Sequence, residues 1–140
     1  MAGGESLDFR IPSDVQYIEQ VIELVQRECA LMHFGARQLM LNLAVALTEA
    51  LSNAILRGND DDPAKHVQVM ARVDSARVVI EVVDEGDGFD MDACTTDPTT
   101  PGNVDREDGR GLFLMRQLMD RVERFDDARG NVVRLTLDRR

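Results

Sequence analysis

The chain has 140 residues, enough for one domain that buries a core without a metal ion or disulfide bonds. Its formal net charge is −10 and no cluster of Lys and Arg stands out, which argues against a nucleic-acid-binding protein. Its two cysteines, Cys29 and Cys94, do not have the spacing of a metal site or a disulfide framework, which predicts a reducing cytoplasm. The N-terminus has no signal-peptide pattern, and no run of 18 apolar residues predicts a membrane span.

The N-terminal half predicts one strand and two helices. Residues 7–11 alternate apolar and polar side chains, as in a half-buried strand. Residues 13–16 have the spacing of a capping box and start a first helix, which reaches about Met32. The second helix runs from about 37 to 57 and ends at the terminating pair Gly58-Asn59.

The C-terminal half predicts two hairpins with a loop and a helix between them. One strand of the first hairpin is apolar on both faces, which places it centrally in a sheet. The long loop shows no periodicity, and such loops are usually functional or disordered. The last two strands meet at a turn containing Gly130-Asn131. In order, the segments are strands 67–73 and 77–84, loop 88–108, helix 110–120, and strands 121–126 and 132–137.

This order, β-α-α-β-β-loop-α-β-β, has too few helices to cover both faces of a sheet. It predicts an α+β protein: a two-layer sandwich of a largely antiparallel mixed sheet of about five strands, with three helices on one face. No linker or repeat divides the chain, so residues 1–140 are expected to form a single domain.

Several common sites are excluded. The single lysine, Lys65, lies in no P-loop, and the signatures of eukaryotic-type protein kinases and of G-x-S-x-G hydrolases are absent. Gly109-Arg-Gly111 lacks the third glycine of a dinucleotide-binding fingerprint. His33 and His66 are isolated, so neither belongs to a spacing typical of metal ligands.

The second helix carries two stripes. Apolar residues recur every four positions, and the polar residues Asn42, Glu49 and Asn53 share another face beside small alanines. Alone, such a Glu/Asn pair is typical of a solvated face. The apolar stripe consists of Leu43, Leu47, Leu51 and Ile55.

Two glycine-containing stretches change that interpretation. Gly86 and Gly88 follow Asp84 at a strand end, where glycines let a flat ligand approach and the carboxylate accepts a hydrogen bond from an exocyclic amine; a plain tight turn would also explain them. The stretch 109–112 opens the third helix, whose N–H groups suit a polyphosphate.

With a polyphosphate in place, Glu49 and Asn53 supply the groups that phosphate chemistry still lacks. Glu49 offers a carboxylate base, and Asn53 offers a neutral oxygen ligand for Mg²⁺.

The three stretches Glu49-Ala-Leu-Ser-Asn-Ala54, Asp84-Glu-Gly-Asp-Gly-Phe-Asp90 and Gly109-Arg-Gly-Leu112 resemble the asparagine box and the two glycine boxes of the GHKL (Bergerat) ATP-binding fold. The match is to its small stand-alone branch, the bacterial anti-sigma-factor serine/threonine kinases. It extends from about residue 7 to 137, with residues 89–108 as the lid.

The resemblance implies a role for each matching residue. Glu49 would be the catalytic base, and Asn53 would hold Mg²⁺ against the phosphates of ATP. The adenine pocket and the phosphate cradle would be formed by Asp84, Gly86, Gly88, Gly109, Arg110, Gly111, Leu112 and Thr136.

The resemblance also implies a function: a kinase that binds Mg·ATP, holds a sigma factor inactive and phosphorylates a serine of a STAS-type anti-anti-sigma protein. It further suggests a homodimer. The alternative is an ATP-binding regulatory interaction module with little or no turnover. Arg57 supports the alternative, because many family members have a histidine at that position. A histidine kinase catalytic domain and a gyrase-type ATPase fit less well, because the phosphoacceptor helix and the transducer domains are absent from the sequence.

Overall fold

The computed structural model describes residues 4–86 and 107–140, with the backbone alone for 107–110. Five strands and three helices are present in these ranges, and short 3-10 and π segments, η1 to η3, flank the first two helices. In chain order they are β1 Glu5–Pro12, η1 Val15–Tyr17, α1 Ile18–Leu31, η2 Gln38–Leu43, α2 Ala44–Asn53, η3 Ala54–Gly58, β2 His66–Val73, β3 Arg77–Asp84, α3 Glu107–Leu118, β4 Arg121–Asp127 and β5 Gly130–Asp138.

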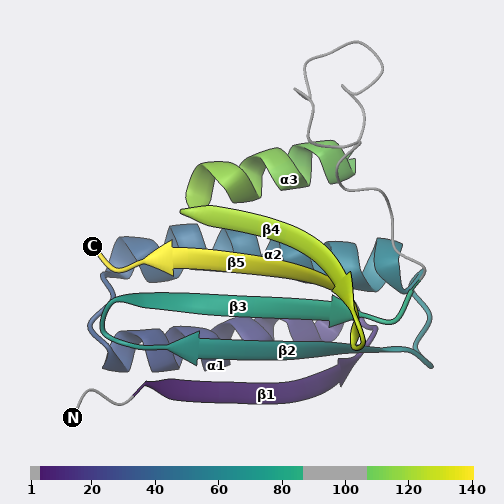
Figure 1. The fold of residues 1–140 in the computed structure, drawn as a ribbon, viewed down its shortest axis with the longest axis horizontal. Helices are drawn as coiled ribbons and strands as arrows, with labels where there is room; N and C mark the ends of the chain where they lie inside the picture. Colours follow the sequence, from purple (N-terminus) through teal and green to yellow (C-terminus); the bar gives the residue numbers. More distant parts are fainter. Residues whose placement is uncertain (1–3, 87–106) are drawn as a thin grey trace.

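The strands form one sheet in the order β1-β2-β3-β5-β4, and every neighbouring pair is antiparallel. The expected α+β architecture, with a five-stranded sheet and three helices on one face, is confirmed (Figure 1). β3 lies in the middle of the sheet, as its apolar residues on both faces predict.

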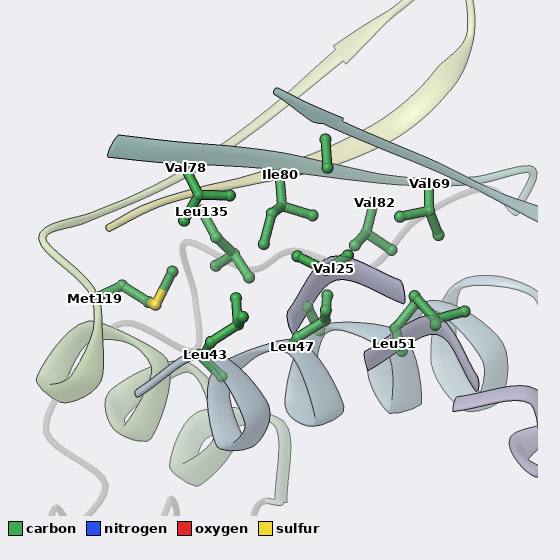
Figure 2. Packing of buried hydrophobic residues seen from close by; sticks show 14 of the residues in the cluster. Val25, Leu43, Leu47, Leu51, Val69, Val78, Ile80, Val82, Met119 and Leu135 are labelled. Atoms are coloured by element: carbon green, nitrogen blue, oxygen red, sulfur yellow. The ribbon is translucent and has the colours of Figure 1, made fainter. Parts of the chain in front are cut away.

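The core lies between the sheet and the helix layer. The apolar stripe of the second helix, Leu43, Leu47, Leu51 and Ile55, is fully buried. It packs toward alternate β-strand side chains such as Val78, Ile80, Val82 and Leu135 (Figure 2). Apolar residues recur every four positions on the helix and every two positions on the strands. These periods put each set on one face of its element, so both sets meet in the layer between the helices and the sheet. Burying each such side chain contributes about 1.5–3 kcal/mol to stability.

The helix Gln38–Gly58 is long and apolar enough to cross a membrane by length and composition alone, with a mean hydropathy of 1.6. Its leucine stripe packs into the core between the helices and the sheet, and 39% of the apolar window is buried in this way. The other described helices do not pass the same test.

Local details differ from the expected boundaries. Asp14, rather than Ser13, caps η1, the 3-10 turn that leads into α1, by accepting a hydrogen bond from Gln16 N at 3.0 Å. The last hairpin turns at Ala128-Arg129, and Gly130 already belongs to β5 with a φ of +137°. Asp127 pairs with Gly130, so the turn has two residues and the predicted Gly130-Asn131 turn is wrong by two positions.

Candidate functional site

The candidate site lies at one end of the molecule, on the helix side of the sheet. The carboxyl end of β3, the end of the long helix at η3 and the beginning of α3 all reach this end (Figure 1). β5 begins beside the end of β3, because Asp84 and Asn131 are register partners. The asparagine-box helix and the two glycine stretches therefore converge in space, although long segments separate them in sequence.

Asp84 is the buried acid of this end, with 5% of its surface exposed. Along β3 it lies on the same face as Val78, Ile80 and Val82, because alternate residues of a strand share a face. These three residues are buried in the core, so the Asp84 side chain also points toward the helices. Its Oδ1 accepts hydrogen bonds from Gly86 N at 3.0 Å and from Asn131 Nδ2 at 2.9 Å.

Burial raises the pKa of Asp84. Two hydrogen bonds to its carboxylate oppose that shift; the negative charge of Asp126 adds to it and the positive charge of Arg124 opposes it. A carboxylate kept in a site that disfavours its charge is typical of a ligand-binding position.

Gly58 and Gly86 bring the helix end and the strand-end loop into backbone contact. A Cβ on Gly58 would overlap the Asp84 carboxylate, and a Cβ on Gly86 would overlap the carbonyl oxygen of Gly58. Gly58 has no positive φ, so it is needed here for space and does not serve as a left-handed helix terminator. The left-handed residues after this helix are Asp60 and Asp61, with φ of 53° and 54°.

Glu49 and Asn53 are half-buried on α2, and α3 passes over them at Gly111. A Cβ on Gly111 would lie 2.9 Å from Glu49 Oε2 and 3.5 Å from Asn53 Nδ2. The absence of a side chain at position 111 thus lets the α3 backbone approach both polar groups. The predicted grouping of these three residues is present in the structure.

Asn42, the third polar residue of that face, has a different role. Its Nδ2 donates to the carbonyl oxygen of Leu118 at 2.7 Å, which satisfies a carbonyl at the C-terminal end of α3. Asn42 therefore ties α3 to the long helix and stands apart from Glu49 and Asn53.

The remaining glycine-box residues are only partly described. α3 begins at Glu107, earlier than expected, so Gly109 and Arg110 lie in its first turn, where backbone N–H groups lack partners within the helix. Leu112 is 1% exposed and its side chain belongs to the core. Gly88 and most of the expected lid, 89–108, lie outside the described residues.

The structure does not bring Thr136 to the site. Thr136 pairs with Val79, and directly paired residues share a face. Val79 points away from the core face of Val78 and Ile80, so Thr136 lies on the open face of the sheet, away from Asp84. The alternation Leu135-Thr136-Leu137, with both leucines buried, is a sequence signal for this placement.

Three residues at this end of the fold have roles that the sequence does not predict. The sequence indicates Gly58 and Asn59 only as helix-ending residues, and Asn131 only as part of a turn. Asn131 donates from one Nδ2 to both Asp84 Oδ1 and, at 2.6 Å, the carbonyl oxygen of Gly86. No local pattern marks these roles, because each partner lies far away in the chain.

The donor set suits Mg²⁺ that arrives with a nucleotide. Within the described residues no group of three or more His, Cys, Asp or Glu is placed to hold a metal ion. Glu49 and Asn53 do lie together and offer oxygen ligands. Mg²⁺ usually takes one or two protein oxygens and completes its shell with phosphates and water, so this sparse set fits it.

The chain is similar to a known domain family and to several of its members. Residues 11–137 match the histidine kinase-like ATPase domain family. A serine-protein kinase RsbW of Bacillus velezensis is 32% identical over 122 residues, covering 84% of this chain and 76% of that protein. An anti-sigma F factor of Clostridium beijerinckii is 26% identical over 100 residues, covering 71% and 69%.

Among solved structures, the RsbU and RsbW domains of Rv1364c from Mycobacterium tuberculosis share the fold, with a TM-score of 0.68. The match covers 97% of this chain and 33% of that one at 16% identity, which supports the fold alone.

Proposed function

The chain belongs to the histidine kinase-like ATPase domain family, in the branch of the RsbW serine-protein kinases, and on this basis we propose that it binds Mg·ATP and phosphorylates a serine of a partner protein. The partner is a STAS-type anti-anti-sigma protein, and the kinase also holds a sigma factor inactive. The anti-sigma F factor among the relatives supports the second part of this proposal.

The observation that carries the proposal is the approach of α3 to the polar face of α2. Gly111 lies against Glu49 and Asn53, while Asp84 lies at the same end of the helix layer, beside Gly58. An adenine-recognising acid and a phosphate-handling pair therefore share one end of the fold.

We assign the roles as follows. Asp84 accepts a hydrogen bond from the adenine amino group, and Gly86, whose missing side chain leaves room for the carbonyl oxygen of Gly58, shapes the base pocket. The first turn of α3, including Gly109 and Arg110, turns its N–H groups and the positive end of the helix dipole to the phosphates.

Two residues of α2 then act on the reaction itself. Glu49 accepts the proton of the attacking serine hydroxyl. Asn53 is a protein ligand of Mg²⁺, which when bound supplies neutralisation of the phosphate charge. Phosphoryl transfer depends mainly on positioning and charge neutralisation, so few protein groups are needed.

Separate changes of Glu49 and Asn53 test the assignment. Glu49→Gln should keep nucleotide affinity but lower transfer to a co-purified STAS-type partner by about 10²–10⁴-fold. Asn53→Ala should lower Mg²⁺-dependent nucleotide binding and transfer together. Glu23→Gln, an exposed change on α1, is the control. The kinase assignment fails if Glu49→Gln transfers phosphate as fast as the wild-type protein.

A second candidate is an ATP-binding regulatory module with little turnover. Arg57 favours it: this residue is exposed in η3, next to Gly58, at a position where many family members have a histidine. Nucleotide binding without phosphate transfer to any co-purifying partner, in the wild-type protein, is the result that this candidate predicts.

We propose that residues 1–140 act as one domain, that the protein works in the cytoplasm, and that it forms a homodimer. The lid that the resemblance implies at 89–108 is kept as a proposal; all of it except Glu107 and Asp108 lies outside the described residues. Size-exclusion chromatography with light scattering tests the dimer directly.

A further inference from the structure

We infer that Asn59 is a positioning residue of the nucleotide site, which holds the Asp84–Gly86 loop in place for recognition of the base. This inference rests on the proposed binding of an adenine nucleotide at Asp84. Asn59 directly follows η3, and none of its side-chain hydrogen bonds goes to a group that we assign to the nucleotide itself. It acts through the backbone of the residue next to Asp84.

The side chain of Asn59 is fully buried and all three of its hydrogen bonds reach other segments. Its Oδ1 accepts from Glu85 N at 2.8 Å. Its Nδ2 donates to Ser13 Oγ at 2.7 Å and to the carbonyl oxygen of His66 at 3.0 Å. One amide thus joins the strand-end loop to the start of β2 and to the corner after β1.

The corner itself is well fixed. Ser13 donates to the carbonyl oxygen of Lys65 from its backbone N at 3.1 Å and from its hydroxyl at 3.0 Å. The backbone N of Asn59 also bonds to Ala54 O at 2.9 Å, which completes the π-type turn of η3. Asn59 therefore connects the loop to a rigid support, and a polar side chain without these partners would be costly at this depth.

The geometric consequence falls on Asp84. Glu85 N belongs to the peptide that links Asp84 to Glu85, so the bond from Asn59 fixes that peptide plane. On the other side, Asn131 holds the carbonyl oxygen of Gly86. With both ends held, the Asp84 carboxylate keeps one direction beneath Gly58, as selective recognition of an exocyclic amine requires.

Asn59→Leu, of similar volume, removes all three bonds. We expect the Kd for ADP to rise about tenfold, because the peptide between Asp84 and Glu85 is no longer held and the Asp84 carboxylate loses its fixed direction. The preference for ADP over GDP should fall by a similar factor. At saturating ATP the kcat for partner phosphorylation should stay within about twofold, because Glu49 and Asn53 are unchanged.

Gln38→Leu is the matched control. Gln38 is also buried, donates to Asp138 O at 2.7 Å and accepts from Arg140 N at 3.2 Å, but it lies in η2 at the far end of the same helix. Its loss should lower the unfolding midpoint without changing nucleotide affinity or base preference. If Asn59→Leu and Gln38→Leu lose ADP affinity equally, Asn59 has a purely structural role and the inference is wrong.

Hydrogen exchange on the wild-type protein decides the point if Asn59→Leu does not fold. The Glu85 amide should exchange slowly without nucleotide, and should exchange at least tenfold faster in Ser13→Ala, which removes one support of Asn59. Rapid exchange of Glu85 in the wild-type protein overturns the inference. If wild type binds no adenine nucleotide, the proposed function fails as well; if wild type binds and Asn59→Leu binds equally, only this inference fails.

Discussion

Gly111 of α3 lies directly against the carboxylate of Glu49 on α2, so close that a Cβ at position 111 would be 2.9 Å from Glu49 Oε2. The contact joins a residue of the second glycine box to the proposed catalytic base. It also makes position 111 a point where stability and activity should respond in opposite directions.

Gly111→Ala should keep or raise stability while lowering phosphate transfer. Alanine is about 1 kcal/mol more favourable than glycine inside a helix. The new methyl group would push the flexible end of Glu49 aside, and small misplacements of a catalytic group cost about 10²-fold in rate. Thermal unfolding and transfer assays measure the two effects. Gly35→Ala, where a Cβ meets nothing within 4 Å, is the control.

Gly58→Ala should damage both the fold and the nucleotide site. Its backbone conformation suits alanine, but the methyl group would overlap the Asp84 carboxylate. Overpacking of this kind costs about 1–3 kcal/mol. Urea unfolding should show the loss, and calorimetry should show weakened ADP binding. The double variant Gly58→Ala/Asp84→Ala should recover stability but not binding; if stability stays low, a cause other than this overlap is required.

Asp84→Asn should weaken nucleotide binding at least tenfold while the protein stays as stable as wild type, or becomes more stable, at neutral pH. Burial raises the pKa of Asp84, so ionising this carboxyl costs stability in the folded state. The buried adenine amine would lose a charged acceptor, a loss of about 1–3 kcal/mol.

The raised pKa of Asp84 also predicts how the stability of the fold depends on pH. Because the folded-state pKa lies above its ordinary value of 3.8, Asp84 stabilises the fold below that value, and this contribution is lost as pH rises through the folded pKa. The stability advantage of Asp84→Asn over wild type should therefore be absent in acid and grow toward neutral pH. An advantage that does not change with pH would contradict the assigned shift.

Glu81→Gln should lower stability without touching nucleotide binding. On the open face of the sheet, Glu81 pairs with Arg129 at 2.6 Å and Arg134 at 2.9 Å, and Arg134 also stacks over Phe125. Since these groups are partly solvated, the loss should be about 1–2 kcal/mol. Unfolding curves measure it, and ADP affinity should equal that of wild type because this face lies away from Asp84.

Although burial alone would raise the pKa of Glu81, the hydrogen bonds from Arg129 and Arg134 outweigh it and lower that pKa. Its stabilising contribution is therefore present above the ordinary value of 4.5 and is lost as pH falls through the folded pKa. The difference in unfolding free energy between wild type and Glu81→Gln should therefore become smaller in strong acid.

The sequence by itself determined the elements and the residues that carry the candidate chemistry. The four-residue spacing from Leu43 to Ile55 identified the core helix, and the alternating strands identified the hairpins, because burial on one face requires these periods. The stretches around Asn53, Asp84 and Gly111 stood out because glycine and polar residues interrupt those patterns.

Only the tertiary structure decided how these stretches are held together. Gly58, at the end of a helix, is required because Asp84 approaches it from the end of strand β3, and Asn59 reaches Glu85, 26 positions along the chain. Local propensity describes a residue and its near neighbours, and it contains no information about a backbone that approaches from elsewhere in the fold. Sites where two segments meet at close range therefore become visible only once the sheet and helices have brought them together.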